Sequence, residues 1–577
     1  NKKFMILLKN ILCGIQIFRK SKKFLLIMTS LFIGAHAFGQ ITINGSVSDS
    51  DGPLPGASVI IQGSNVGVTT DFDGKFSIEA NQGEMLELSY VGFKTQLIKV
   101  NSIDNNISII LESDNQLDEI IVTGYGFERR SQITGAVASI SPAEMNKNTA
   151  STLDNALQGK VAGVSVSSNN STPGGGISVR IRGVGGIGNS EPLYVIDGMP
   201  ITVSGNENSS PLSSINPQDI ESISILKDAA SAAIYGSRAA NGVVLINTKT
   251  GKRNQKSEVA VSAKYGVQSA ANSYSMMDAQ SFADYRNLLE TNAGRPAIFT
   301  NTASLGKGTN WFDAITRSAE ISDLQASFTG GSETGSYFLS LGHFKQEGIV
   351  KSSSFERISL RLNADKRISD KFKIGSNIVV SRTKQDVLWG NNRAISSGIA
   401  QSVLFYPTIP VYDNDGNFSP TPANGFYKPK VNPLFQLSIP AYPPIVNSIR
   451  ANVYAEYKIM PDLVFKTSAF YTDSNTSRKE FGSMYDLGVA VSTEQTILKQ
   501  QSQSYNALIE NTLNYRLNID NHSLGILLGQ SAQSIEQESL LVSGDYFEMG
   551  NNTIDELASA LNVTNVINEE SYMSFFS

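Results

Sequence analysis

The second half of the chain alternates apolar and polar residues over long segments, and this pattern restricts the possible folds strongly. Successive side chains of a β-strand point to opposite faces, so alternation indicates a strand with one apolar and one polar face. Val259, Val261, Ala263, Tyr265 and Val267 share one such face. Nine strands are predicted in this way, near residues 259–267, 322–328, 337–341, 358–364, 372–380, 449–459, 463–472, 504–517 and 524–534.

Such strands suit either a half-exposed sheet or a barrel wall that faces lipid. Uneven connections favour the barrel, because a short turn at Gly330 to Gly335 contrasts with the long excursion from Gln385 to Asn447. That excursion is rich in Pro, Tyr and Asn, as an extracellular loop would be. One helix is predicted from Asp278 to Glu290, before the second strand.

The first 39 residues have the pattern of a secretory signal peptide. Seven Lys or Arg and no acid occur in the first forty residues, with an apolar run from Phe24 to Ile33 and small residues at Ala37 and Gly39. The run is about ten residues, whereas a membrane-spanning helix needs roughly 20. We therefore predict a signal peptide over residues 1–39, with Gln40 as the first mature residue, rather than a membrane anchor.

Charge and cysteine content exclude several kinds of function. Seven of the 47 Lys and Arg lie in the signal, which leaves 40 against 52 acidic residues, a formal charge of about −12, so nucleic acid is not an expected partner. The one cysteine, Cys13, also lies in the signal, and only His343 and His522 remain after cleavage. Disulfides, thiolate sites and histidine-rich metal sites are thereby excluded. No catalytic residue, cofactor or metal is predicted, and Asp71 and Asp73 indicate a hairpin turn rather than a calcium site.

Residues 40–113 are predicted to form a small β-sandwich, because short strands alternate with Gly- and Asp-containing turns. The seven strands are expected near residues 43–47, 57–62, 67–70, 75–80, 85–90, 96–100 and 106–111. The segments Gly45 to Asp49, Pro53 to Val59, Gly67 to Phe76 and Ser89 to Phe93 resemble the carboxypeptidase-regulatory-like domain. Members of that domain are accessory sandwiches, so the resemblance implies no peptidase activity.

Residues 127–252 are rich in Gly, Ser and Ala and are predicted to form a mixed α/β globule. Short helices are expected at 141–146 and 152–157, and strands at 177–182, 193–196, 220–226 and 242–248. A Gly-x-Gly-x-x-Gly pattern occurs at Gly183, Gly185 and Gly188. It does not indicate a dinucleotide site, because a strand at Leu193 follows it rather than a helix.

This globule resembles the plug of TonB-dependent outer-membrane transporters, in the segments Asp154 to Val164, Ile181 to Gly183 and Pro192 to Ile201. Its most specific segment, Ile220 to Gly251, resembles the signature of the SusC/RagA family. Within that signature a strand, a short helix of small residues opened by Lys227 and Asp228 and ended by Tyr235 and Gly236, and a second strand are expected. Small residues let such a helix pack close to a sheet.

The segment Leu117 to Gly126, between sandwich and plug, is a short apolar strand led by two acids, and it resembles a TonB box. An extended segment at a domain junction can add itself to the sheet edge of a partner. The linker is predicted to cover residues 114–126. The residues predicted to engage TonB are Asp118, Glu119, Ile120, Ile121, Val122 and Thr123.

The resemblance implies a multi-domain fold in which an antiparallel transmembrane barrel of about 22 strands follows the sandwich and the plug. Residues 253–577 would form the N-terminal part of that barrel. Since nine strands do not close such a circle, the chain is expected to be an N-terminal fragment. Its place would be the outer membrane of a Gram-negative, Bacteroidota-like bacterium, with sandwich and plug facing the periplasm.

The implied function is energised import of nutrients, with oligosaccharides as the first expectation and peptides as the second. The implied partners are TonB with its ExbB/ExbD motor, a SusD-like surface lipoprotein as a lid, and outer-membrane lipid. A secreted β-rich adhesin or structural protein is the alternative, but it leaves the signature at Ile220 to Gly251 unexplained. An enzyme is not expected, because the acids occur mostly at turns. Five aromatic residues suit either sugar stacking, loop cores or membrane girdles: Trp311, Trp389, Phe405, Tyr406 and Tyr427.

Overall fold

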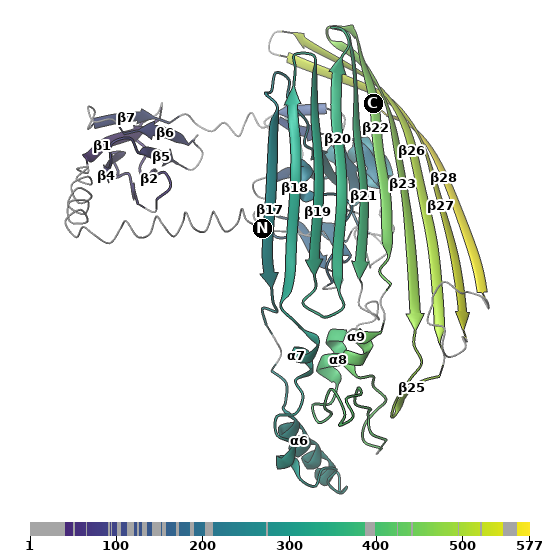
Figure 1. The fold of residues 1–577 in the computed structure, drawn as a ribbon. Helices are drawn as coiled ribbons and strands as arrows, with labels where there is room; N and C mark the ends of the chain where they lie inside the picture. Colours follow the sequence, from purple (N-terminus) through teal and green to yellow (C-terminus); the bar gives the residue numbers. More distant parts are fainter. Residues whose placement is uncertain are drawn as a thin grey trace, which may run out of the picture. The chain divides into compact units, whose positions relative to one another are not determined.

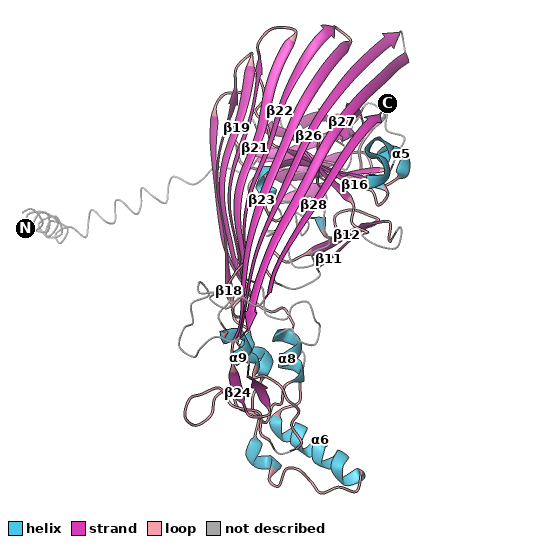
Figure 2. Cartoon of the chain, turned by 90° about the vertical axis from the view of Figure 1, so that its right-hand side faces the viewer, coloured by secondary structure: helices cyan, strands magenta, loops and turns pink. Residues whose placement is uncertain are grey.

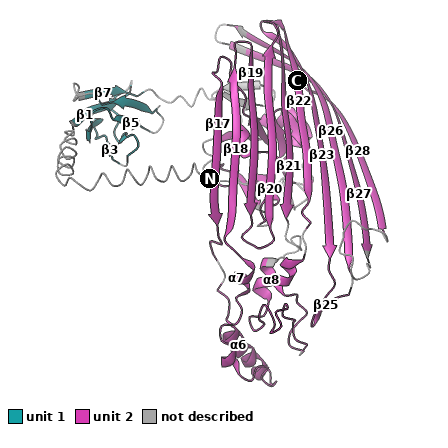
Figure 3. Ribbon diagram, viewed as in Figure 1, with its two compact units in different colours: residues 1–120, 129–132 teal, residues 121–128, 133–577 magenta. Residues whose placement is uncertain are grey.

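The structure is a computed structural model of the 577-residue chain, which divides into two compact units, shown in Figure 3. Within the part of the chain that the structure describes, no helix is long and apolar enough to cross a membrane. The described residues are 41–49, 52–64, 66–90, 93, 95–100, 106–111, 120–123, 126–129, 136–140, 152, 157–168, 172–184, 190–201, 212–272, 275–386, 398–423, 425–439, 442–493, 495–519, 522–545 and 562–576.

The first unit contains two small sheets that enclose an apolar core, as predicted for a sandwich. One sheet has the order β4-β1-β7 and the other the order β3-β2-β5-β6 (Figure 1). Alternate residues such as Phe76, Ile78 and Ala80 are buried between them. The strands are β1 (Ile41–Ser48), β2 (Ser58–Ile61), β3 (Gly67–Thr69), β4 (Lys75–Ala80), β5 (Met85–Ser89), β6 (Gln96–Lys99) and β7 (Asn106–Ile110).

The Asp-x-Asp-Gly sequence between β3 and β4 forms a tight turn. The carboxylate of Asp71 accepts hydrogen bonds from the backbone N–H groups of Asp73 and Lys75, at 3.0 and 2.8 Å. The same turn recurs in the second unit, where Asp413 accepts from the N–H groups of Asp415 and Asn417. In both places the carboxylate of the first aspartate accepts hydrogen bonds from backbone N–H groups of its own turn, as Asp commonly does in turns.

The segment that resembles a TonB box lies partly in a two-stranded ribbon. β8 (Ile120–Thr123) pairs with β9 (Gly126–Arg129). Asp118 and Glu119 lie outside the described residues. The segment was expected to be a free strand, whereas its apolar part already has one neighbour.

The plug region is built on a five-stranded sheet of order β10-β15-β16-β13-β14 and a separate pair, β11 and β12. β13 and β16 are parallel, and the other pairs are antiparallel. The predicted helix at 141–146 and most of the one at 152–157 lie outside the described residues. The strands are β10 (Val137–Ile140), β11 (Val164–Ser168), β12 (Ile177–Ile181), β13 (Leu193–Ile196), β14 (Met199–Ile201), β15 (Ile220–Leu226) and β16 (Val243–Thr248).

The signature segment folds as a strand, a short helix and a returning strand. After β15, α5 (Ala229–Ala232) begins at Asp228, whose carboxylate accepts a hydrogen bond from the backbone N–H of Ser231 at 2.8 Å. A 3-10 segment, η5 (Ala233–Ala239), continues it. Gly236 interrupts the helical backbone with a φ of 66°, a conformation that favours glycine. The helix was predicted to end at Tyr235 and Gly236, and the chain instead makes a kink there before β16.

Ten antiparallel strands in chain order form the large sheet, one more than the nine predicted (Figure 2). The tenth, β28, lies beyond the last predicted segment, at 524–534. Among the described residues the sheet is open, with β17 and β28 as its edges. Its strands are β17 (Glu258–Gln268), β18 (Ala319–Gly331), β19 (Gly335–Glu347), β20 (Ser354–Arg367), β21 (Phe372–Asp386), β22 (Ile445–Met460), β23 (Leu463–Gly482), β26 (Thr496–Ile519), β27 (His522–Asp545) and β28 (Asn562–Phe576).

The two faces of this sheet have the opposite polarity to a sheet of a water-soluble protein. On the outer face, Val261, Leu341 and Leu360 are 76%, 56% and 45% exposed. On the inner face, Arg357 and Arg361 are each only 1% exposed. A sheet with apolar residues outside and polar residues inside is the pattern of a barrel wall in lipid.

Short helices gather at one end of the large sheet, between β17 and β18 and between β21 and β22 (Figures 1 and 2). They are α6 (Ala279–Asn292), η6 (Thr302–Leu305), α7 (Trp311–Ile315), α8 (Gly398–Leu404) and α9 (Pro433–Ser438), and a small hairpin of β24 (Tyr485–Leu487) and β25 (Ala490–Ser492) follows β23. α6 begins after Asp278, where the sequence predicts it, and Asp278 caps it by accepting from Ser281 N–H.

The aromatic residues that suited sugar stacking form a core among these helices. Trp311, Phe405 and Tyr427 are buried together, and the indole Nε1 of Trp311 donates to the carbonyl of Tyr406 at 2.9 Å. Trp389 lies outside the described residues. The described aromatics therefore stabilise the connections of the sheet, and the loop-core alternative is the one that the geometry supports.

A charge in the middle of the outer face should destabilise the protein strongly. We expect Leu362→Arg in the full-length receptor to lower the free energy of unfolding by about 2–4 kcal/mol, because Leu362 pairs with Ile378 inside the apolar band and an Arg there would be transferred from water to lipid. Asn447→Arg, at the end of the apolar band, should cost less than about 1 kcal/mol. Denaturant unfolding in lipid vesicles measures both, and equal effects would show that the outer face does not contact lipid.

The cap of α5 should depend on pH. Hydrogen bonds from the N–H groups of Ser231 and Ala136 lower the pKa of the Asp228 carboxyl below its ordinary 3.8. Its stabilising effect is then complete above pH 3.8 and is lost as pH falls through the lowered pKa. We expect Asp228→Ala to destabilise the plug by about 1 kcal/mol at neutral pH. The difference in stability between the original protein and the variant should disappear as the pH falls below 3.8. The urea midpoint for hydrogen exchange of plug amides measures it at each pH. A difference that stays constant with pH would show that the cap is not an ionised carboxylate.

Candidate functional site

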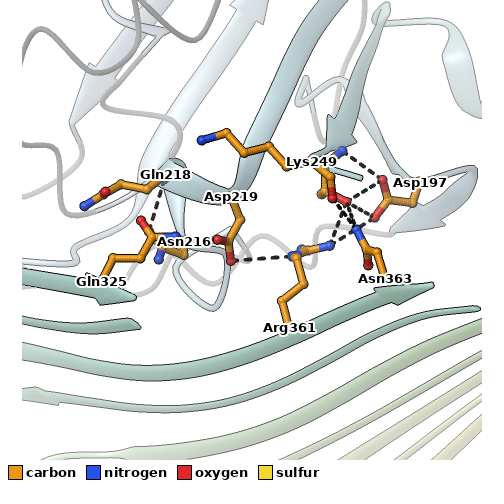
Figure 4. A network of polar contacts seen from close by, with 9 residues as sticks. Asp197, Asn216, Gln218, Asp219, Lys249, Gln325, Arg361 and Asn363 are labelled. Atoms are coloured by element: carbon orange, nitrogen blue, oxygen red, sulfur yellow. Dashed lines mark hydrogen bonds and ion pairs between the residues drawn. The ribbon is translucent and has the colours of Figure 1, made fainter. Parts of the chain in front are cut away.

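The plug region meets the inner face of the large sheet through a network of polar side chains around Arg361, shown in Figure 4. Arg361 lies in the middle of β20. Its guanidinium forms ion pairs with Asp197 at 3.3 Å and Asp219 at 3.5 Å, and it donates to the hydroxyl of Thr248 at 2.8 Å. All three partners belong to the plug region. One buried cation of the sheet therefore joins three separate plug segments.

Local structure brings these partners together. Asp197 lies in the turn between β13 and β14 with a φ of 50°, in the left-handed region that Asp tolerates in tight turns. Thr248 is the last residue of β16, the parallel neighbour of β13, and both its N–H and its hydroxyl bond to the Asp197 carboxylate. The two strands thus end at the same edge of the plug sheet, directly above Arg361.

Asp219 reaches the network from a single 3-10 turn, η4 (Pro217–Asp219), which is capped by Asn216. Gln325 of β18 donates to the Asp219 carboxylate at 2.7 Å. Burial raises the pKa of the Asp219 carboxyl, and the charge of Arg361 counters part of that increase. Because both charges are buried and joined to neighbours, removing either would leave the other without compensation.

Further contacts extend the seam between plug region and sheet. Asn363 of β20 donates to Thr248 at 3.1 Å and to the carbonyl of Lys249 at 2.6 Å. Arg357 donates to the carbonyl of Ser213 at 3.1 Å. Other pairs join Arg450 to Ser214, Gln385 to the carbonyl of Pro173, and Arg238 to Gln533. In the central part of this seam the sheet supplies the cations and the plug supplies the anions.

Glycines permit the closest approaches. A Cβ at Gly342 of β19 would lie 2.6 Å from the side-chain nitrogen of Asn216, which is far inside contact distance. A Cβ at Gly174 would lie 2.2 Å from the ring of Phe355, and Gly174 also has a φ of +66°. The seam is therefore packed as well as hydrogen-bonded.

The sequence identified the two sides of this seam but not their pairing. Arg361 and Asn363 occupy polar positions of the strand predicted near 358–364, and Asp197 lies within the plug-like segment Pro192 to Ile201. Nothing in one sequence shows which Arg meets which Asp across more than 160 residues. The predicted TonB-binding residues do not belong to the network: Ile120 to Thr123 lie in β8, and Asp118 and Glu119 lie outside the described residues.

The contacts of the seam hold the plug region against the inner face of the sheet. Among the described residues there is no group of three or more His, Cys, Asp or Glu placed to hold a metal. Each described partner of Arg361 is held by further hydrogen bonds, so the plug is fixed by many polar contacts. Unlike an apolar core, such contacts can be exchanged for contacts with water.

Comparisons with known proteins agree with this architecture. The family profile of the TonB-dependent Receptor Plug Domain matches residues 129–243, and that of the CarboxypepD_reg-like domain matches residues 43–122. TonB-dependent receptor P26 of Formosa agariphila is 36% identical over 520 residues, which cover 88% of this chain and 50% of the relative. TonB-dependent receptor SusC of Bacteroides thetaiotaomicron is 35% identical over 471 residues, covering 77% and 45%.

Among solved structures, the RagAB peptide importer in its 'open-open' state superposes with a TM-score of 0.66 at 26% identity, covering 79% of this chain and 54% of that one. Plug, sandwich-like domain and ten-stranded sheet confirm the predicted fold class and define a TonB-dependent receptor. Within that class, the chain belongs to the SusC/RagA-like TonB-dependent receptors.

The chain spans about half the length of the curated relatives it matches. TonB-dependent receptors such as SusC and RagA are outer-membrane proteins of Bacteroidota, and they are transporters rather than enzymes.

Loss of the central cation should loosen the plug. We expect Arg361→Gln in the full-length receptor to destabilise the seated plug by about 3–5 kcal/mol, because Asp197 and Asp219 would stay buried without their partner. Arg253→Gln is the matched control, since Arg253 pairs with Asp365 at 3.3 Å but is 30% exposed, and its loss should cost less than about 1 kcal/mol. Protease cleavage of the plug along a urea series gives both values. Similar sensitivity of the two variants would contradict the central role of Arg361.

Proposed function

We propose that the complete receptor imports nutrients across the outer membrane with energy supplied through TonB. The observation that carries this proposal is the polar, hydrogen-bonded seam between a plug and the inner face of a sheet whose outer face is apolar. An apolar outer face suits lipid, and a plug held by exchangeable contacts suits displacement by force. In this arrangement sandwich and plug face the periplasm, where TonB is reached.

TonB would engage the segment Asp118 to Thr123. β8 is one strand of a two-stranded ribbon, so its described residues have β9 on one side and an edge available on the other. A partner strand can add to such an edge through main-chain hydrogen bonds. ExbB and ExbD would drive TonB, and the pull would pass from β8 through β9 toward the plug.

Force on the plug would be resisted at the seam around Arg361. The contacts there come from short plug segments at Asp197, Asp219 and Thr248. Asp197 and Thr248 bond to each other and would leave Arg361 together, whereas Asp219 lies on a separate turn, so the contacts can be released in steps, with water replacing each bond. This sequence needs a smaller force than simultaneous separation of an equally large apolar interface.

The substrate is proposed to be an oligosaccharide, with a peptide as the second candidate. The relation to SusC and the likeness to a structure named as a peptide importer support nutrient uptake without choosing between these classes. A SusD-like surface lipoprotein is the proposed lid. A secreted adhesin, the alternative from another class, would not need an apolar outer face on a ten-stranded sheet or a plug behind it.

A proline in β8 should stop uptake without affecting assembly. Ile121→Pro removes one N–H and disfavours pairing in the strand that TonB is proposed to bind. We expect energised uptake to fall to background while heat-modifiable migration of the receptor in the outer membrane stays normal. Ile121→Val, which keeps strand propensity, is the control and should transport normally. Uptake by the proline variant at the original rate would contradict the assignment of the TonB-binding segment.

A further inference from the structure

The apolar band on the outer face of the large sheet ends at a sharp boundary. Along β21, the outward positions from Phe372 to Val380 are apolar except for Ser376, and Arg382, Lys384 and Asp386 follow directly. The eight residue steps from Phe372 to Val380 span about 27 Å of strand. At a tilt of roughly 40° this length rises about 20 Å, which is close to the apolar band of roughly 25 Å in transmembrane barrels.

A charged pocket of about 530 Å³ lies immediately beyond this boundary. It is formed at the ends of β19, β20 and β21 on the outer face. The strand register places Lys345, Glu356 and Lys384 side by side in one row. Arg317, Glu347 and Asp386 complete its charged lining.

The acids of this pocket already have partners. Glu347 pairs with Arg317 at 3.2 Å and with Lys345 at 3.5 Å. Glu356 bonds to His343 at 2.9 Å, and Asp386 accepts a hydrogen bond from the hydroxyl of Ser354. The carboxylates are therefore engaged within the lining of the pocket or at its border.

Two cations beside these acids remain without a partner. Arg382 and Lys384 are both exposed on the outer face, and neither side chain has a hydrogen bond or an ion pair to another described residue. They project from the same strand, two residues apart, with the apolar side chains of Val380 and Ile378 next in line. A ligand that contacted all four positions would need an anionic head and an apolar tail.

We propose that the outer face between this pocket and the apolar band binds the phosphate-bearing headgroup of an outer-membrane lipid. Lys384, which lines the pocket, and Arg382, one outward position nearer the band, would contact the phosphate, and the acyl chains would lie along Val380 and Ile378. The guanidinium of Arg382 can hold phosphate through two parallel hydrogen bonds, and long basic side chains place their charge at the interface while their stems cover apolar surface. A free phosphate would bind the two cations but would not contact Val380 and Ile378. The inference rests on the outer-membrane placement of the receptor, not on what it imports.

The test uses full-length receptor purified in detergent and native mass spectrometry. The probes are phosphorylated lipid A, the same lipid after dephosphorylation, and inorganic phosphate. We expect the double variant Arg382→Gln, Lys384→Gln to bind phosphorylated lipid A about tenfold more weakly or worse, because two charge-assisted contacts are lost. Lys366→Gln with Lys371→Gln, at the opposite ends of the same strands, should bind like the original protein. Arg382→Lys with Lys384→Arg, which keeps both charges, should retain binding.

Three outcomes would overturn the proposal: unchanged affinity of the double glutamine variant, equal binding of dephosphorylated lipid A, or equal binding of inorganic phosphate. Uptake by cells that carry the variants is measured in parallel. Normal uptake by a variant that no longer binds lipid supports a lipid site that is separate from transport. If the unmodified receptor imports no nutrient, the proposed function is contradicted, while the result on lipid binding still holds.

Discussion

The structure depends on one constraint: the large sheet must present an apolar face to lipid and a polar face to the plug. In a water-soluble sheet the apolar face is buried and the polar face is solvated. Here Leu341 and Leu360 point outward, and Arg357 and Arg361 are almost fully covered. Because side chains alternate strictly along a strand, a shift of register by one residue would put Arg361 into lipid and Leu360 against the plug. The long paired strands prevent that shift.

The same constraint explains why the seam is ionic. Side chains on the inner face of a barrel are polar, so a domain that fills the interior must offer hydrogen-bonding groups rather than an apolar surface. The plug does so at the ends of its own strands, where turns place Asp197 and Thr248 side by side. Its apolar core is kept separate, in one cluster between the sheet and β12 and another between the sheet and the helical segments. The plug therefore has a stable apolar interior and a polar surface whose contacts can be replaced by water, which are the two properties that the proposed displacement requires.

The fold could be predicted from the sequence where the signal is local. The sandwich strands, the β13 and β15 strands and helix α6 lie within one or two residues of their expected positions, because alternation and an N-terminal Asp cap are short-range patterns. Strand lengths were underestimated: β26 and β27 each have 24 residues, and the runs at 499–504 and 536–539 are polar on both faces, so alternation fades there. Arg361 could not be recognised as the centre of the seam, because its importance comes from burial and from partners distant in sequence. The aromatic residues near Trp311 had several possible roles, and only packing distinguishes a loop core from a stacking surface.

The length of β26 and β27 affects the receptor beyond the bilayer. At about 3.4 Å per residue, 24 residues reach roughly 80 Å along the strand, which is more than twice the thickness of the apolar band even after tilt is included. Their polar halves, around Gln500 and Ser539, are joined by side-chain hydrogen bonds as well as by the backbone ladder. In an outer-membrane barrel, these strands would extend beyond the membrane as a continuous β-sheet rather than as loops. A protein that covered the barrel on this side would contact a rigid sheet edge, and the length of the strands would set its height.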